Sequence, residues 1–161
     1  MVLKALKNSD WSFDSLCFVC DPTNERGLGV QFFHDQEAKL VVAELELARP
    51  YSGAPNYVHG GAVAAVLDEA MAWAVIALLE RFGITRRSEI SYKKPLLIGQ
   101  PYRVEAWVEE HADRKVTAKA RVLSGDQVHT ESQGSYWVMD ADEARRAIGG
   151  LSSEDQSFVR D

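Results

Sequence analysis

The segment Asn56–Glu69, NYVHGGAVAAVLDE, decides how this chain folds. It opens an apolar stretch that continues to Leu79 and predicts one long buried helix. Two glycines stand at its start, and the acidic pair Asp68 and Glu69 follows about two turns later. Glycine weakens a helix interior by about 1 kcal/mol relative to alanine, and a carboxylate among apolar side chains is unfavourable unless something pairs with it or uses it. The combination therefore indicates a functional site.

The composition is that of one globular domain. The chain has 161 residues, of which 46% are hydrophobic and 26% are charged, and this length can bury a core without added cross-links. A formal net charge of −6 disfavours nucleic acid as a partner, because phosphate backbones bind basic surfaces. The segment Thr85–Lys94, TRRSEISYKK, is a local basic cluster that could hold a small anionic ligand.

Extended segments lie on both sides of the predicted helix. The strand-like spacing of β-branched and aromatic residues predicts six strands, at 28–33, 39–47, 84–94, 102–110, 115–123 and 127–139. The breaks between consecutive strands are short, which favours antiparallel pairing. Since the helix is apolar nearly all round, the sheet should curl about it. The predicted fold class is α+β, with a six-stranded antiparallel sheet wrapped around one long central helix that Gly83 caps at its C-terminus.

The two ends of the chain are predicted to lie outside this unit. Residues 1–27 should form a short amphipathic helix and a loop, 28–139 the main domain, and 140–161 a polar tail with a loose helix around Ala141–Ile148. The start of the sequence has no apolar run typical of a signal peptide. The acidic pair in mid-span also disfavours a membrane helix. We therefore expect a cytoplasmic protein without a membrane partner.

Cys17 and Cys20 form a single C-x-x-C pair. A structural zinc site normally needs a second such pair or suitably spaced histidines, and neither occurs. The favoured interpretation is therefore two reduced cysteines that pack in the interior. Zinc held with the help of His34 is the alternative.

The motifs as a group resemble the hotdog-fold acyl-CoA thioesterases of the phenylacetate-pathway type. HGGAVAAVLD places an acid nine residues after His59, and SYKKPLLIGQPYRVEAWV follows the helix. CFVCDPTNERGLGVQF is also similar to the N-terminal region of many members, so that the resemblance covers roughly Cys17–Met139. It implies a hotdog domain over 28–139 that hydrolyses acyl-CoA thioesters to free acid and CoA. It implies no cofactor and no metal.

By this resemblance, Gly60 and Asp68 carry the reaction. The N–H of Gly60 would polarise the thioester carbonyl, and Asp68 would act as general base or nucleophile. A helix N-terminus suits a developing oxyanion, because its N–H groups are unpaired and its dipole is positive there. Glu69 is the competing acid, but it points about 100° away on a helix. Asp68 could instead form a structural ion pair with Arg49 or Arg87.

Gly60 and Asp68 are too far apart to serve one substrate from one chain. Eight helical residues separate them by about 12 Å, whereas both must reach atoms around one carbonyl. Two antiparallel helices related by a two-fold axis would bring Gly60 of one chain against Asp68 of the other. Small residues on the same face as Asp68 would allow this approach, namely Ala64, Ala65 and Ala72. The prediction is a homodimer, or a homotetramer built as a dimer of dimers.

Supporting roles are predicted for residues around these two. His59 is expected to orient the loop before the helix rather than to take part directly in the chemistry. Some similar proteins carry an amide six residues before the motif histidine, where this chain has Gly53, and others use a threonine that corresponds to Thr85. Thr85 is thus a candidate to hold the attacking water, although it could be an ordinary strand residue. The predicted substrate-binding residues are Asn56, Gly61, Arg86, Arg87 and Lys93.

The basic residues of this set have two interpretations. Arg86, Arg87 and Lys93 could contact the CoA phosphates together with Lys94, or they could be a solvated strand edge. Two other functions also stay open at this point. The main alternative is a non-catalytic protein that binds or senses acyl-CoA on the same scaffold, and a hotdog dehydratase is the other.

Overall fold

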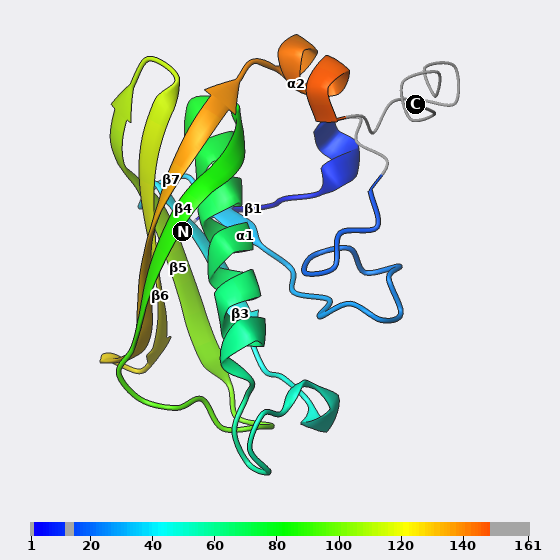
Figure 1. Cartoon of the computed structure of the whole chain (residues 1–161), viewed down its shortest axis with the longest axis vertical. Helices are drawn as coiled ribbons and strands as arrows, with labels where there is room; N and C mark the ends of the chain where they lie inside the picture. Colours follow the sequence, from blue (N-terminus) through cyan, green and yellow to red (C-terminus); the bar gives the residue numbers. More distant parts are fainter. Residues whose placement is uncertain (1, 12–14, 149–161) are drawn as a thin grey trace.

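An antiparallel sheet curves around one long helix, as predicted (Figure 1). The computed structural model describes residues 2–11 and 15–148. The strands are β1 (Leu3–Ala5), β2 (Phe33–Asp35), β3 (Leu40–Leu45), β4 (Phe82–Tyr92), β5 (Tyr102–Ala112), β6 (Lys115–Ser124) and β7 (Gln127–Met139). The helical elements are η1 (Asn8–Trp11), η2 (Arg49–Tyr51), α1 (Gly60–Leu79) and α2 (Ala141–Ile148). In space the strands follow the order β1-β2-β3-β5-β6-β7-β4, so β4 forms one edge of the sheet.

The central helix α1 is fixed at both ends. Its N-cap is His59, whose Nδ1 accepts the N–H of Gly61. At the other end Glu80 adopts a left-handed backbone (φ 53°) and donates its N–H to the carbonyl of Ile76. The prediction that Gly83 caps the helix was therefore wrong, because Gly83 lies inside β4. By length and composition alone α1 could cross a membrane, and here eight of its side chains are buried in the core of the domain.

The core lies between α1 and the concave face of the sheet. Alternate residues of β5 and β6 face the helix, including Val104 and Ala106 on β5 and Ala118 and Val122 on β6, all essentially inaccessible to solvent. This period of two is what one buried sheet face requires. It explains why the strand positions could be predicted to within two residues after the helix.

The N-terminal region differs from the prediction. In place of an amphipathic helix, Leu3–Ala5 pairs antiparallel with β2 as a seventh strand, and a 3-10 turn follows at Asn8–Trp11. Pairing with the sheet satisfies the backbone groups of this short segment. The strand predicted at 28–33 also begins later, as Phe33–Asp35.

The C-terminal helix was correctly predicted at Ala141–Ile148. Arg114 fastens it to the β5–β6 turn, because both of its terminal nitrogens donate to the carboxylate of Glu143, at 2.9 and 2.7 Å. The rest of the predicted polar tail, residues 149–161, lies outside the described residues.

Candidate active site

The carboxylate of Asp68 is held by two hydroxyl groups. Thr85 Oγ1 donates to Asp68 Oδ1 at 2.9 Å, and the Tyr136 hydroxyl donates to the same oxygen at 3.0 Å. Among the described residues, Oδ2 has only the longer contact to Thr85, at 3.3 Å. Burial, followed by the charge of Asp68, raises the pKa of Tyr136, so this phenol keeps the proton that it donates. The carboxylate is therefore oriented with Oδ2 as the freer oxygen.

Sheet register explains why these two donors meet. Thr85 on β4 and Tyr136 on β7 are direct antiparallel partners, so both side chains stand on the same face. A β-bulge follows immediately, between Thr85 and Arg87. Bulges change the direction of the side chains beyond them. The strand pair thus aims two hydroxyl groups at one turn of α1.

Two glycines make room for the Tyr136 ring. A Cβ atom at Gly134 would lie 2.8 Å from Tyr136 Cε2 and 3.1 Å from Met71 Cε, and one at Gly83 would lie 3.1 Å from Tyr136 Cβ and Cδ1. Such contacts are tighter than ordinary packing allows. A side chain at Gly83 or Gly134 would therefore crowd this ring.

Replacing Tyr136 with phenylalanine should lower kcat while leaving KM nearly unchanged. The variant keeps the buried ring but leaves Asp68 Oδ1 with one donor, so the carboxylate is less well oriented. We expect a loss of roughly tenfold to a hundredfold, in line with a hydrogen bond to a charged group worth about 1.5–3 kcal/mol. Steady-state kinetics with an acyl-CoA would measure it. A rise in KM with unchanged kcat would contradict a role in orienting Asp68.

Thr85→Val should also lower kcat without loss of folding. Valine has the same shape but no hydroxyl, so both contacts to Asp68 disappear. In this structure Thr85 donates to the carboxylate, and its oxygen keeps lone pairs that can accept from a water molecule. Thr85 can therefore contact Asp68 and a water molecule at the same time. That it holds the attacking water stays a prediction. Thr85→Ser restores the hydroxyl and is the matched control, and loss of activity in both variants would point to packing.

The N-terminus of α1 presents one free amide. Gly61 donates its N–H to His59 Nδ1 at 2.8 Å, so this amide is already used within the chain. In the described part of the chain nothing accepts the N–H of Gly60, which is exposed. The Tyr92 hydroxyl donates to the Gly60 carbonyl at 2.9 Å and so holds the next peptide unit, which carries the N–H of Gly61. His59 thus caps the helix, and Gly60 keeps the donor that a substrate carbonyl needs.

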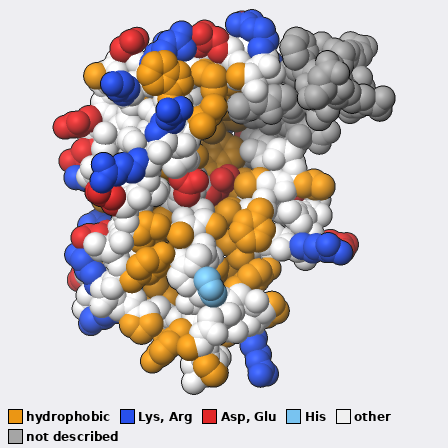
Figure 2. Space-filling view, viewed as in Figure 1, with side chains coloured by type: hydrophobic (Ala, Val, Ile, Leu, Met, Phe, Trp, Pro, Cys, Tyr) orange, Lys and Arg blue, Asp and Glu red, His pale blue; other side chains and the backbone are white. Residues whose placement is uncertain are grey.

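Gly60 and Asp68 lie on one continuous helix, as the sequence predicted. The separation of about 12 Å along the axis therefore applies. Figure 2 shows the face on which α1 lies in Figure 1, with acidic side chains near its centre and hydrophobic side chains above and below them. No ion pair joins Asp68 to Arg49 or Arg87 within the described residues, and Arg87 instead pairs with Glu89.

The neighbouring acid, Glu69, points elsewhere. Its Oε1 accepts from Cys20 Sγ at 3.0 Å and from Cys17 Sγ at 3.3 Å. Burial, followed by the charge of Cys17, raises the pKa of Glu69 to about 7. Two adjacent acids on α1 therefore face different surroundings, and Asp68 is the one that contacts β4 and β7.

The predicted phosphate-binding residues lie on β4 and just beyond it. Lys93 pairs with Glu131 at 2.8 Å, and Arg87 pairs with Glu89. Arg86 occupies the bulge next to Thr85 and has no ion pair among residues 2–11 and 15–148. Arg86 is thus the basic residue of this set that is nearest in sequence to Thr85 of the Asp68 site. Among these residues it is also best able to bind a new anion.

Asn56 lies in the loop before α1, beside a hollow of about 620 Å³. The hollow is lined by Arg49, Pro55, Asn56, Tyr57, Leu97, Ile98 and Gln100. The Asn56 carbonyl accepts the N–H of Ile98, which leaves its exposed side chain available. The loop therefore offers space near the helix N-terminus for part of a ligand.

Sequence reasoning missed Tyr136 and Tyr92. Tyr136 follows Gly134 by two residues, and a glycine in a strand often marks a close approach by another group. Tyr92 lies in the SYKKP stretch quoted above. No role was predicted for either residue. The register of β4 and β7 reveals the first, and the hydrogen bond to Gly60 reveals the second.

Part of the chain is similar to a known superfamily. Residues 55–130 match the thioesterase superfamily. The chain is 27% identical over 122 residues to acyl-coenzyme A thioesterase THEM4 from Rattus norvegicus, which covers 73% of this chain and 52% of that protein. It is 31% identical over 118 residues to acyl-coenzyme A thioesterase THEM5 from Mus musculus, which covers 71% and 46%. The chain thus spans about half the length of these curated relatives.

Solved structures share the architecture. A crystal structure of a thioesterase superfamily protein matches with a TM-score of 0.70 and 25% identity, covering 75% of this chain and 59% of that one. A phenylacetic acid degradation-related protein from Ralstonia eutropha matches with a TM-score of 0.61 and 20% identity, covering 68% and 85%. The fold is the hotdog fold, with seven strands where six were predicted.

Proposed function

We propose that this protein is an acyl-CoA thioesterase that hydrolyses its substrate to free acid and CoA. The observation that carries the proposal is the pairing, on one helix, of a free N-terminal amide at Gly60 with a carboxylate at Asp68 that two hydroxyl groups orient. The relatives named acyl-coenzyme A thioesterases support the same reaction.

The chemistry follows from these two groups. The Gly60 N–H donates to the thioester oxygen and stabilises the negative charge that develops there. Asp68 Oδ2 takes a proton from water, whose oxygen attacks the carbonyl carbon. The carbon–sulfur bond then breaks, and CoA leaves as the thiolate and takes up a proton. Direct attack by Asp68, through an anhydride that water hydrolyses, is the alternative.

Each active site is proposed to use two chains. Ala64, Ala65 and Ala72 are only partly buried, so a second helix can approach Asp68 closely. Strand β4 is a sheet edge with unpaired backbone groups, and Ile84 and Tyr92 on it are 43% and 53% exposed. An edge of this kind favours pairing with another chain. A two-fold dimer, alone or as half of a tetramer, would give two equal sites.

The proposal also includes the substrate contacts, the thioesterase type and the location. The phosphates of CoA would contact Arg86 with help from Arg87 and Lys93, and the acyl part would lie near Asn56 and Gly61. The phenylacetate-pathway type is supported by the motifs quoted above, and the acyl group stays open. A cytoplasmic location without nucleic-acid or membrane partners is likewise proposed.

A turnover assay tests the proposal. Free CoA thiol is measured after addition of aryl-, short-, medium- and long-chain acyl-CoAs, and binding of each compound is measured in parallel. We expect steady turnover with at least one class. Tight binding of every class without release of CoA would identify a non-catalytic sensor instead.

A further inference from the structure

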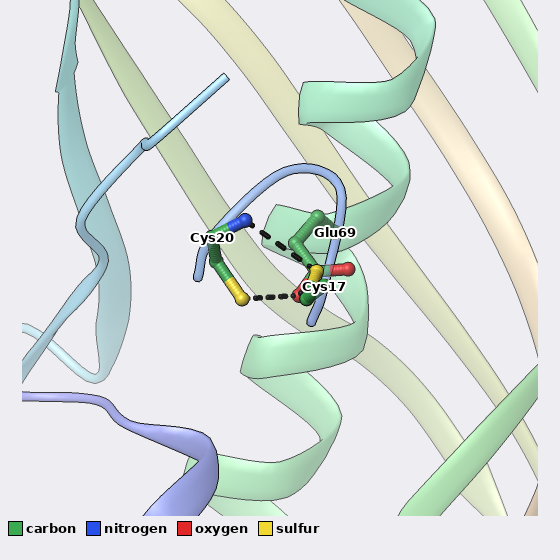
Figure 3. Close-up of side chains that lie close together, drawn as sticks. All are labelled: Cys17, Cys20 and Glu69. Carbon is green, nitrogen blue, oxygen red and sulfur yellow. Dashed lines mark hydrogen bonds between the residues drawn. The ribbon is translucent and has the colours of Figure 1, made fainter. Parts of the chain in front are cut away.

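Cys17, Cys20 and Glu69 form a cluster outside the candidate active site (Figure 3). One potential ligand atom from each residue lies within 4.8 Å of the others. The cysteines come from the loop before β2, and the glutamate comes from the middle of α1. The cluster thus joins a segment far away in sequence to the turn of the helix that carries Asp68.

Backbone hydrogen bonds hold the two cysteines in one turn. The backbone N–H of Cys20 donates to Cys17 Sγ at 3.4 Å, and the N–H of Asp21 closes a turn on the Cys17 carbonyl at 3.2 Å. A donor aimed at sulfur favours the thiolate, which is the form that binds metals.

Among the described residues, Glu69 has no cationic partner. Within residues 2–11 and 15–148 it forms no ion pair with lysine, arginine or histidine, and its partners are the two thiols. Thiols are weak hydrogen-bond donors, and a largely buried carboxylate without a strong partner is costly. A divalent cation at this position would compensate the charge of Glu69 and of both thiolates.

We propose that Cys17, Cys20 and Glu69 bind a zinc ion that fastens the N-terminal loop to α1. Two soft thiolates select zinc over magnesium or calcium, and two sulfurs with one carboxylate oxygen supply three tetrahedral ligands. Asn8, whose amide nitrogen lies 3.8 Å from Cys20 Sγ, borders the fourth position. Water or the Asn8 amide oxygen completes the site, and binding releases the thiol protons.

The surroundings give an ion a route to the cluster. A hollow of about 370 Å³ is lined by Cys20 together with Asn8, Asp21 and Gln31 among others. His34, which the sequence offered as a zinc ligand, is paired in the β2–β3 ladder and does not belong to the cluster. The structure therefore replaces His34 with Glu69 as the third ligand.

The test measures metal binding by the full chain, without reference to thioesterase activity. The protein is purified under reducing conditions, and zinc is measured by elemental analysis. Cobalt(II) is then added to the metal-free protein, and thiolate-to-cobalt absorption is recorded. We expect about one metal ion per chain, tetrahedral cobalt spectra and a lower Tm after zinc is removed.

Variants assign the ligands. Cys17→Ser and Cys20→Ser should lose stoichiometric zinc, and Glu69→Gln should weaken the affinity by roughly tenfold or more. His34→Gln and Glu80→Gln are matched controls and should bind as the wild type does. Absence of thiolate-to-cobalt absorption in the reduced protein would overturn the proposal. Wild-type zinc affinity in Glu69→Gln would also overturn it. A disulfide between Cys17 and Cys20 in the purified protein, formed with loss of two hydrogens, would do the same.

Discussion

Asp68→Asn is expected to reduce kcat by about a thousandfold or more while the protein stays folded. Asparagine keeps the shape of the side chain and can still accept from Thr85 and Tyr136 through its amide oxygen. It cannot take a proton from water, and a positioned general base contributes about 10²–10⁴ in rate. Steady-state kinetics, with circular dichroism and thermal unfolding to verify the fold, would measure the effect.

Glu69→Gln separates the two adjacent acids. Glu69 points towards Cys17 and Cys20, so its amide variant should keep most of the turnover even if the loop that it holds is loosened. Assays at saturating zinc remove any indirect effect of metal loss. If Glu69→Gln were inactive and Asp68→Asn active, Glu69 would be the base. The hydrogen bonds of Thr85 and Tyr136 to Asp68 would then have a structural role only.

The central helix and the strands after it follow from local patterns. The apolar stretch up to Leu79 and the period-two alternation of β5 to β7 each fit one element only, so their positions could be predicted from sequence. The N-terminal region has no such period. Leu3–Ala5 becomes a strand because β2 offers a free edge, and only the fold supplies that partner.

In the candidate site, too, some residues could be predicted from the sequence and others could not. Gly60 and Asp68 belong to a motif on one continuous helix, so the sequence indicates both. Tyr136 reaches Asp68 only because β7 pairs with β4 in a particular register, and Glu69 meets Cys17 across 52 residues of chain. Contacts between distant segments leave no periodic signal, which is why these partners appear only in the structure.

Gly60→Pro should reduce kcat by about 10²–10³ without breaking α1. Proline removes the one N–H proposed to stabilise the oxyanion, and loss of one such donor costs about this much. The position tolerates it, because Gly60 is the first helical residue, where proline is favoured. His59 has φ −61° and ψ 131°, which suits a residue before proline.

Gly60→Ala is the matched control. Its Cβ would lie 3.6 Å from the Tyr92 ring, an ordinary contact, and its N–H remains. Alanine should therefore retain most of the activity that proline removes. Equal losses in both variants would assign the effect to crowding against Tyr92 rather than to the missing donor.

Co-expression of Gly60→Pro with Asp68→Asn tests whether the site is shared between chains. In a mixed dimer one site combines the intact Gly60 of the first chain with the intact Asp68 of the second, and the other site has both defects. Random pairing makes half of the dimers mixed, so two nearly inactive variants should together recover about one quarter of wild-type activity. A site built within one chain cannot be repaired by mixing. Two affinity tags verify that mixed dimers have formed. If activity does not recover in these dimers, the shared site is refuted. One chain would then have to bring Gly60 and Asp68 to the same substrate despite about 12 Å of helix between them.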